Sequence, residues 1–184
     1  MASQLRITYF VHGTTTDNLD KRQSGWNDTE LAPIGIRQSE ELRVIIQDRP
    51  FDVVICSDLK RAVQSAELSF KERGISIIKD QRLRECNYGE LNGKTIVTDH
   101  LMPRFIEEPF PGGECLKDVE RRILSLLEEL KTKYPGKMVA FVAHQAPQLA
   151  LDVILKGKTW QQAIQEDWRH QVPKAWKPGW EYIL

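Results

Sequence analysis

The chain has 184 residues, a length that suits one domain with a full hydrophobic core, so we expect a single domain over residues 1–184. Hydrophobic residues make up 41% of the chain and charged residues 28%, which is an ordinary composition for a globular protein, and the formal net charge is +0. A balanced charge excludes the global basic field that holds nucleic acid, so any anion site must be built locally.

Several features predict a cytoplasmic protein with no membrane and no nucleic-acid partner. No apolar run reaches the length of a transmembrane helix, and the first ten residues do not follow the pattern of a signal peptide. Cys56, Cys86 and Cys115 are odd in number and share no CxxC spacing, which argues against a disulfide framework and a structural zinc site. No sequence feature bears on the oligomeric state.

Strand-like and helix-like segments alternate along the chain. Short apolar runs at residues 7–11, 53–56, 75–78 and 138–143 predict strands, and 181–184 is a candidate final strand. Apolar stripes of helical period cover 59–70 and 116–134, and another begins near Pro147, which suits a first helical turn. Residues 13–33 and 86–115 are expected to be long loops, and the tryptophan-rich segment 168–180 an irregular surface segment. The alternation predicts an α/β fold with a mainly parallel sheet covered on both faces.

Polar residues follow three of these strands. His12 follows the first strand, Arg61 falls in the first turn of the helix after the second strand with Ser57 as its expected N-cap, and His144 follows the strand ending at Ala143. Ligands of open α/β sheets bind at the carboxyl ends of the strands, where helix N-termini favour anions. These residues therefore predict an anion site at one edge of the sheet.

The same residue types suit phosphoryl transfer. A neutral imidazole can act as the nucleophile, an arginine and a second histidine can stabilise the transferred charge, and Glu85 is a candidate proton donor. Each residue also has a simpler interpretation. His12 could be a structural hydrogen-bonding group, Arg61 a solvated helix residue paired with Asp58, and Glu85 a surface charge. His100 and His170 are expected to lie on the surface.

Six segments, in the same order, resemble signatures of the histidine phosphatase superfamily, the phosphoglycerate mutase-like clan. The first, FVHGTTTDN at residues 10–18, resembles the RHGxT…N signature. The others resemble, in turn, the motifs GxxDxxLxxxGxxQ (25–38), SDLxRAxQTA (57–66), LxExxxGxxxG (83–93), PGGES (111–115) and the second histidine (142–144).

The resemblance implies a three-layer αβα sandwich with a mostly parallel sheet, and no metal or dissociable cofactor. By the matching positions, His12 would be phosphorylated, Arg61 and His144 would hold the phosphoryl oxygens, and Glu85 would donate a proton. By their match to the first motif, Gly13, Thr15 and Asn18 would contact the phosphate or the substrate. Gln145, directly after the second histidine, is a fourth expected contact.

Two positions depart from the family pattern. Val11 stands where the family has an arginine whose fork of donors binds phosphate, and Gln145 stands where glycine is usual. Losing one donor typically costs roughly 10²–10³ in rate. Lys21, Arg22 and Lys60 are candidate replacement cations in the matching segments. In the alternative interpretation, Val11 simply finishes a buried strand and no cation replaces the arginine. Gln145 is expected to narrow the pocket or to contribute its amide.

Three functions are open. The first is a phosphomonoesterase that acts on a small phosphorylated metabolite through a phosphohistidine at His12. A phosphoglycerate mutase ranks lower, because such mutases carry a longer insertion over the site. A non-catalytic or very slow pseudo-phosphatase that binds a phosphorylated ligand is favoured by Val11 and Gln145. The mixed charge of the expected pocket wall suits a polar, hydroxyl-bearing substrate, and its residues are Asp99, His100, Arg104, Glu107 and Glu108.

Overall fold

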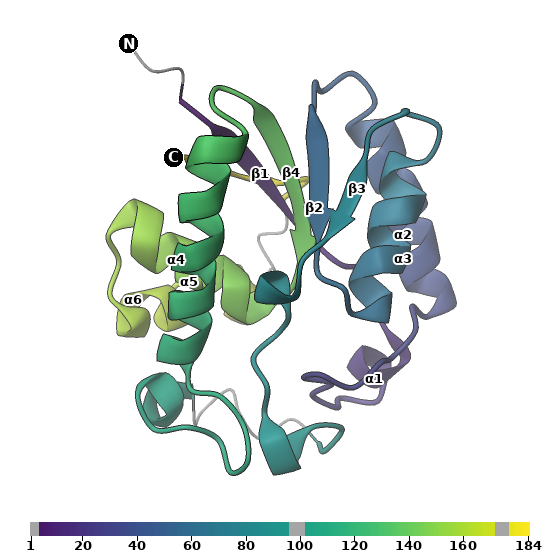
Figure 1. Cartoon of the computed structure of the whole chain (residues 1–184). Coiled ribbons are helices and arrows are strands. Elements are labelled where there is room, and N and C mark those ends of the chain that lie inside the picture. Colours follow the sequence, from purple (N-terminus) through teal and green to yellow (C-terminus); the bar gives the residue numbers. More distant parts are fainter. Residues whose placement is uncertain (1–3, 96–101, 172–176) are drawn as a thin grey trace.

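The computed structural model describes residues 4–95, 102–171 and 177–184, and a five-stranded sheet forms its central layer (Figure 1). The strands are β1 (Arg6–Val11), β2 (Val53–Cys56), β3 (Ile77–Lys79), β4 (Met138–Ala143) and β5 (Trp180–Ile183). Their order is β3-β2-β4-β1-β5, in which only the β1–β5 pair is antiparallel. The predicted mostly parallel sheet is therefore confirmed, although β3 begins two residues later than expected.

Helices cover both faces of the sheet (Figure 1). On one face lie α2 (Pro33–Ile45) and α3 (Lys60–Phe70), and on the other α4 (Leu116–Lys133), α5 (Gln145–Lys156) and α6 (Trp160–Gln165). Short elements interrupt the connections: α1 (Thr16–Leu19), η1 (Gln81–Leu83), η2 (Gly89–Leu91), η3 (Met102–Ile106) and η4 (Trp168–His170). The three-layer αβα arrangement is confirmed. Among the helices described, none is both long and apolar enough to cross a membrane.

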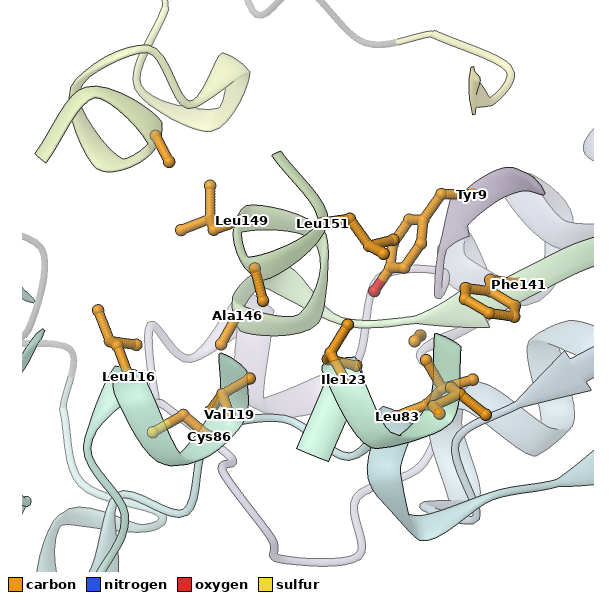
Figure 2. Close-up of a cluster of buried hydrophobic side chains, with 14 of the residues drawn as sticks. Tyr9, Leu83, Cys86, Leu116, Val119, Ile123, Phe141, Ala146, Leu149 and Leu151 are labelled. Carbon is orange, nitrogen blue, oxygen red and sulfur yellow. The ribbon is translucent and has the colours of Figure 1, made fainter. Parts of the chain in front are cut away.

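Strand β1 separates two hydrophobic clusters because successive side chains of a strand point to opposite faces. Ile7 and Tyr9 belong to the cluster shared with α4 and α5, whereas Phe10 belongs to the cluster shared with α2 and α3. Figure 2 shows Tyr9 and Phe141 facing the side chains of α4 and α5. Val11, two residues after Tyr9, packs against this same cluster and completes the strand.

The turn into α3 differs from the expected N-cap. Leu59, not Ser57, is the N-cap residue, and its backbone is extended. The Ser57 hydroxyl instead accepts the Leu59 N–H at 3.3 Å within the turn. A tertiary partner serves the helix end, because the Asp28 carboxylate accepts the Lys60 N–H at 2.9 Å. Arg61 lies in the first turn as predicted.

The loop after His12 is held by a close contact between two glycines. A Cβ on Gly13 would lie 2.4 Å from the Gly35 carbonyl oxygen, and one on Gly35 would lie 2.1 Å from that of Thr14. The Gly13 N–H donates to the Ser65 hydroxyl at 2.9 Å, and the Thr14 N–H donates to the Gln38 side chain at 2.9 Å. Helices α2 and α3 thus fix the backbone beside His12.

Candidate active site

The carboxyl ends of β1 and β4 bring two histidines together. The strands are neighbours in register, with Val11 opposite Ala143, so the residues that follow them are adjacent. The ring centroids of His12 and His144 lie 5.0 Å apart. The predicted convergence of residues far apart in the sequence is therefore observed.

Backbone geometry fixes the tautomer of His12. Its Nδ1 lies 2.7 Å from the carbonyl oxygen of Gly13, and because a carbonyl only accepts, Nδ1 must donate its proton. In a neutral imidazole the proton-free nitrogen is then Nε2. Desolvation and the charge of Arg61 lower the pKa of His12 to about 3, so the ring stays neutral at ordinary pH.

His144 is fully buried, and its ring has no partner. Neither ring nitrogen has a hydrogen-bond partner among the residues that the structure describes. Burial and the charge of Arg61 hold its pKa well below the usual value. Its backbone, in contrast, is fixed, because the Tyr9 hydroxyl donates to its carbonyl at 2.7 Å and accepts its N–H at 2.9 Å. An unsatisfied buried polar group costs about 1–3 kcal/mol, so such a ring marks a place for a ligand.

Arg61 is buried rather than solvated. Only 2% of its surface is exposed, and its guanidinium donates to the carbonyl oxygens of Asn27 at 3.0 Å and Gly25 at 2.8 Å. The expected alternative, a pair with Asp58, is wrong because Asp58 pairs with Arg84 at 2.6 Å. The loop carbonyls thus orient a buried cation toward the two histidines, whose pKa values it lowers.

Glu85 is also buried, which excludes the surface-charge interpretation. Its Oε1 accepts the N–H groups of Cys86 and Ala146, both at 2.9 Å, and its Oε2 accepts that of Gln145 at 3.1 Å. Two of these donors belong to the first turn of α5, where the helix dipole favours an acidic side chain. The carboxyl group is therefore fixed beside His144.

The loop after β1 forms a wall of the site. The Trp26 indole N–H donates to the Glu85 carbonyl at 2.7 Å, and the Arg84 guanidinium lies 4.7 Å from the Trp26 ring centroid. A cavity of about 350 Å³ adjoins His12 and Val11 and extends between β1 and α2. Of the residues expected to line the substrate, Arg104 and Glu108 pair with each other on the surface, Glu107 is exposed, and Asp99 and His100 lie outside the described residues.

The four expected phosphate contacts have other partners. Thr15 and Asn18 form the capping box of α1, and the Gly13 N–H is bonded to Ser65. The Gln145 amide donates to the Asp167 carboxylate at 2.6 Å.

The nearby cations proposed from the sequence are all exposed. Lys60 pairs with Glu30 and Arg22 with Asp20, and Lys21 adopts a positive φ. The side chains of His12, Arg61, Glu85 and His144 thus lie close together, whereas the phosphate contacts expected of Gly13, Thr15, Asn18 and Gln145 stay predictions.

Comparison with known proteins identifies the family. The model of the histidine phosphatase superfamily (branch 1) matches residues 9–176. The chain belongs to the histidine phosphatase superfamily. Solved structures of Bacillus stearothermophilus YhfR and of a mycobacterial phosphatase share this fold over most of both chains.

Relatives in the superfamily include phosphatases and mutases. The uncharacterized phosphatase PhoE of Bacillus subtilis is 30% identical over 79% of this chain and 75% of its own. A 2,3-bisphosphoglycerate-dependent phosphoglycerate mutase of Methylorubrum extorquens is 32% identical over 80% of this chain and 77% of its own. A mycobacterial glucosyl-3-phosphoglycerate phosphatase solved with VO3 is 28% identical over 89% of this chain and 87% of its own, with a TM-score of 0.76.

Sequence reasoning missed three groups that shape this superfamily site. Tyr9 orients the His144 backbone, Ser65 holds Gly13, and Asp167 binds Gln145. Alternation along β1 could have placed Tyr9 beneath the site, because it lies two residues before Val11 on the same face. No sequence signal connects Asp167 to Gln145, since that contact depends on how the segment after α6 returns to α5.

Proposed function

We propose that the protein is a phosphomonoesterase that hydrolyses a small phosphorylated metabolite through a phosphohistidine at His12. The observation that carries this proposal is the His12 tautomer, because the Nδ1 contact with Gly13 leaves Nε2 with a free lone pair beside the unpartnered ring of His144. We further propose that it works as a single cytoplasmic domain, in keeping with its three free, buried cysteines.

The first step transfers the phosphoryl group to the enzyme. The lone pair of His12 Nε2 forms a bond to phosphorus as the ester P–O bond breaks. Arg61 and His144 donate to the phosphoryl oxygens, and His144 does so by the N–H of its neutral ring. The leaving oxygen takes a proton from Glu85, whose Oε2 accepts a single backbone N–H and has a lone pair to carry it.

The second step releases phosphate. Glu85, now a carboxylate, takes a proton from a water molecule whose oxygen attacks phosphorus. The P–N bond to His12 breaks, and inorganic phosphate leaves. Glu85 thus acts as general acid in the first step and as general base in the second. Its backbone hydrogen bonds hold the carboxyl group in one position for both steps.

The test is turnover of p-nitrophenyl phosphate and a panel of sugar phosphates and phosphoglycerates. We expect measurable turnover, loss of it in His12→Ala, and no change in His170→Ala, which alters an exposed histidine in η4. Labelled substrate should leave an alkali-stable, acid-labile phosphate on the wild-type chain. Absence of both turnover and label would contradict the proposal.

A mutase activity is the second candidate, favoured by the similarity to phosphoglycerate mutases. It requires that the phosphohistidine be protected from water, so that the phosphoryl group returns to a phosphoglycerate. Interconversion of 3-phosphoglycerate and 2-phosphoglycerate after priming with bisphosphoglycerate would separate it from hydrolysis, which releases inorganic phosphate instead.

Binding without turnover is the third candidate, and Val11 favours it. Gln145 gives it no support, because its amide is turned to Asp167. Calorimetry with inorganic phosphate distinguishes this case: tight binding with no turnover of any panel member would replace the phosphatase proposal with a binding function.

A further inference from the structure

The segment after α6 brings a guanidinium against the first turns of α5, the helix that directly follows His144. Arg169, in η4, donates through Nη2 to the Gln148 side chain at 2.9 Å and through Nη1 to the Asp167 carboxylate at 2.9 Å. Gln148 is buried in the first turns of α5, close behind His144. We propose that Arg169 supplies the phosphate-binding guanidinium that position 11 no longer provides, an inference that rests on the proposed function.

A buried carboxylate joins Arg169 to the catalytic edge. The Asp167 side chain is 1% exposed, and besides Arg169 it accepts the Gln145 amide at 2.6 Å. Gln145 directly follows His144, and its backbone N–H donates to Glu85. Asp167 therefore holds the guanidinium in place against the same turn that carries His144, as a counter-charge positions an anion-binding arginine.

Arg169 approaches from the face on which Val11 lies. Val11 and Tyr9 share one face of β1, the face covered by α5, and Gln148 belongs to α5. Trp168 lines the cavity between β1 and α2 together with Val11 and His12, and the Arg169 guanidinium lies 4.7 Å from the Trp168 ring centroid, although Arg169 is not among the residues that line this cavity. Val11 therefore borders both the α5 face, where Gln148 holds Arg169, and the cavity beside His12.

The guanidinium is near the histidines and retains donors. Arg169 contributes to the lowered pKa of both His12 and His144, which places its charge within electrostatic range of both rings. The side-chain bonds to Asp167 and Gln148 use two of the five N–H groups of an arginine, so three remain outside them. Its side chain is 19% exposed, which leaves access for an anion.

The other cation near His144 is already committed. Arg122 also lowers the pKa of His144, but its guanidinium binds the Glu114 carboxylate and the carbonyl oxygens of Arg82 and Glu85. Besides Arg61, the described arginines that lower the pKa of His144 are Arg122 and Arg169, and only Arg169 of these two binds α5.

The experiment measures kcat/KM for p-nitrophenyl phosphate and the affinity for inorganic phosphate by calorimetry. We expect Arg169→Ala to lower kcat/KM by roughly 10²–10³ and to weaken phosphate binding at least about tenfold. Arg104→Ala, which removes an exposed arginine paired with Glu108, is the matched control and should leave both unchanged.

Rescue separates a phosphate donor from a merely structural residue. In the Arg169→Ala background, added guanidinium ion at non-denaturing concentration, or the second substitution Val11→Arg, should restore phosphate affinity and rate by at least about tenfold. Wild-type values in Arg169→Ala, or a loss that neither rescue relieves, would overturn the inference. If the wild-type protein hydrolyses no substrate, phosphate affinity still tests Arg169. The phosphatase proposal and the Arg169 proposal can therefore fail separately.

Discussion

At the scale of single residues, two neighbouring imidazoles determine which proton transfers the site can perform. Both His12 and His144 have a lowered pKa, chiefly through desolvation, so neither ring is a proton source near neutral pH. His12 is left with a lone pair, and His144 with an N–H to donate. The carboxyl group of Glu85 is therefore the group that must exchange protons with the leaving oxygen and with water.

These lowered pKa values predict how stability depends on pH. In the unfolded chain each histidine binds a proton near pH 6.5, whereas folded His12 does so only at about 3. The unfolded state therefore binds more protons between these values, and the free energy of unfolding should fall as pH drops from 6.5 toward 3, by at most about 1.4 kcal/mol per pH unit for each ring. Above pH 6.5 this contribution should be constant.

Urea unfolding at a series of pH values measures this dependence. His144→Asn should reduce the slope below pH 6.5, because it removes one of the two rings whose pKa is lowered in the folded state. His170→Ala, at an exposed position, should leave the slope unchanged. An identical slope in all three proteins would contradict the assignment of the slope to His12 and His144.

Tyr9 offers a second prediction at this scale. Tyr9→Phe removes the hydroxyl that both donates to and accepts from the His144 backbone. Leaving buried backbone groups unsatisfied should lower the free energy of unfolding by about 1–3 kcal/mol, and displacement of the His144 ring should lower kcat/KM as well. Urea unfolding and p-nitrophenyl phosphate turnover measure the two effects.

Trp160→Phe is the matched control for that substitution. It removes a buried indole N–H that donates to the Glu120 carboxylate at 2.6 Å, between α6 and α4. This variant should lose stability but keep its kcat/KM. Equal effects of both variants on kcat/KM would show that Tyr9 acts through the fold in general and not through His144.

At the scale of elements, α2 sets the position of the catalytic loop by its closeness to the loop backbone. Gly35 lies inside this helix, where alanine would ordinarily be more favourable by about 1 kcal/mol. A side chain there would instead meet the Thr14 backbone, which the helix also holds through Gln38. Glycine at this position lowers the helix propensity of α2 but allows the helix to approach the Thr14 backbone closely.

Gly35→Ala should therefore destabilise the protein, although alanine has a higher helix propensity than glycine. We expect a loss of about 2–4 kcal/mol from the backbone displacement, together with reduced turnover as the loop beside His12 shifts. Arg37→Ala, on the exposed side of the same helix, should change neither quantity. Thermal unfolding followed by circular dichroism is a suitable measurement, and a stabilised Gly35→Ala protein would contradict the close-approach argument.

The sequence predicts this fold well where apolar patterning decides the structure. Strands β1, β2 and β4 fall where their β-branched runs predict them, because buried parallel strands must be almost wholly apolar. Ser57 was misplaced as an N-cap because Asp28, distant in the sequence, takes that role for the α3 N-terminus. Capping preferences of neighbouring residues do not predict a partner such as Asp28, which only the tertiary fold brings to the helix end.

The same division applies to the site. Strand order predicts that His12 and His144 meet, since the carboxyl ends of adjacent parallel strands share one edge. Burial of Arg61, and the three backbone donors of Glu85, depend on the paths of loops that follow no sequence period. The role proposed for Arg169 was not predicted for the same reason.

At the scale of the whole molecule, the site gathers charge and unpartnered donors that an anion would satisfy. An anion that binds only the folded state stabilises it by mass action, by about 3 kcal/mol at a concentration one hundred times Kd. Inorganic phosphate at such a concentration should raise Tm by roughly 5–10 °C for a chain of this size.

Differential scanning fluorimetry with phosphate or with chloride at equal ionic strength measures this shift. Lys60→Ala should respond like the wild type, because Lys60 is exposed and paired with Glu30. An equal rise in Tm with chloride would indicate a general salt effect instead of a phosphate site. Loss of the phosphate-dependent rise in Lys60→Ala would indicate that Lys60 binds the phosphate.

The place of β1 inside the sheet, between β4 and β5, has a consequence for how the chain is made. Strand β1 is synthesised first, yet it pairs on one side with β4, where Arg6 lies opposite Met138, and on the other with β5. At ribosomal rates its apolar residues must wait on the order of ten seconds before either neighbour emerges. During that interval a nascent chain exposes a hydrophobic strand with two open edges, so cotranslational chaperones should contact residues 6–11 before any other part of the sheet.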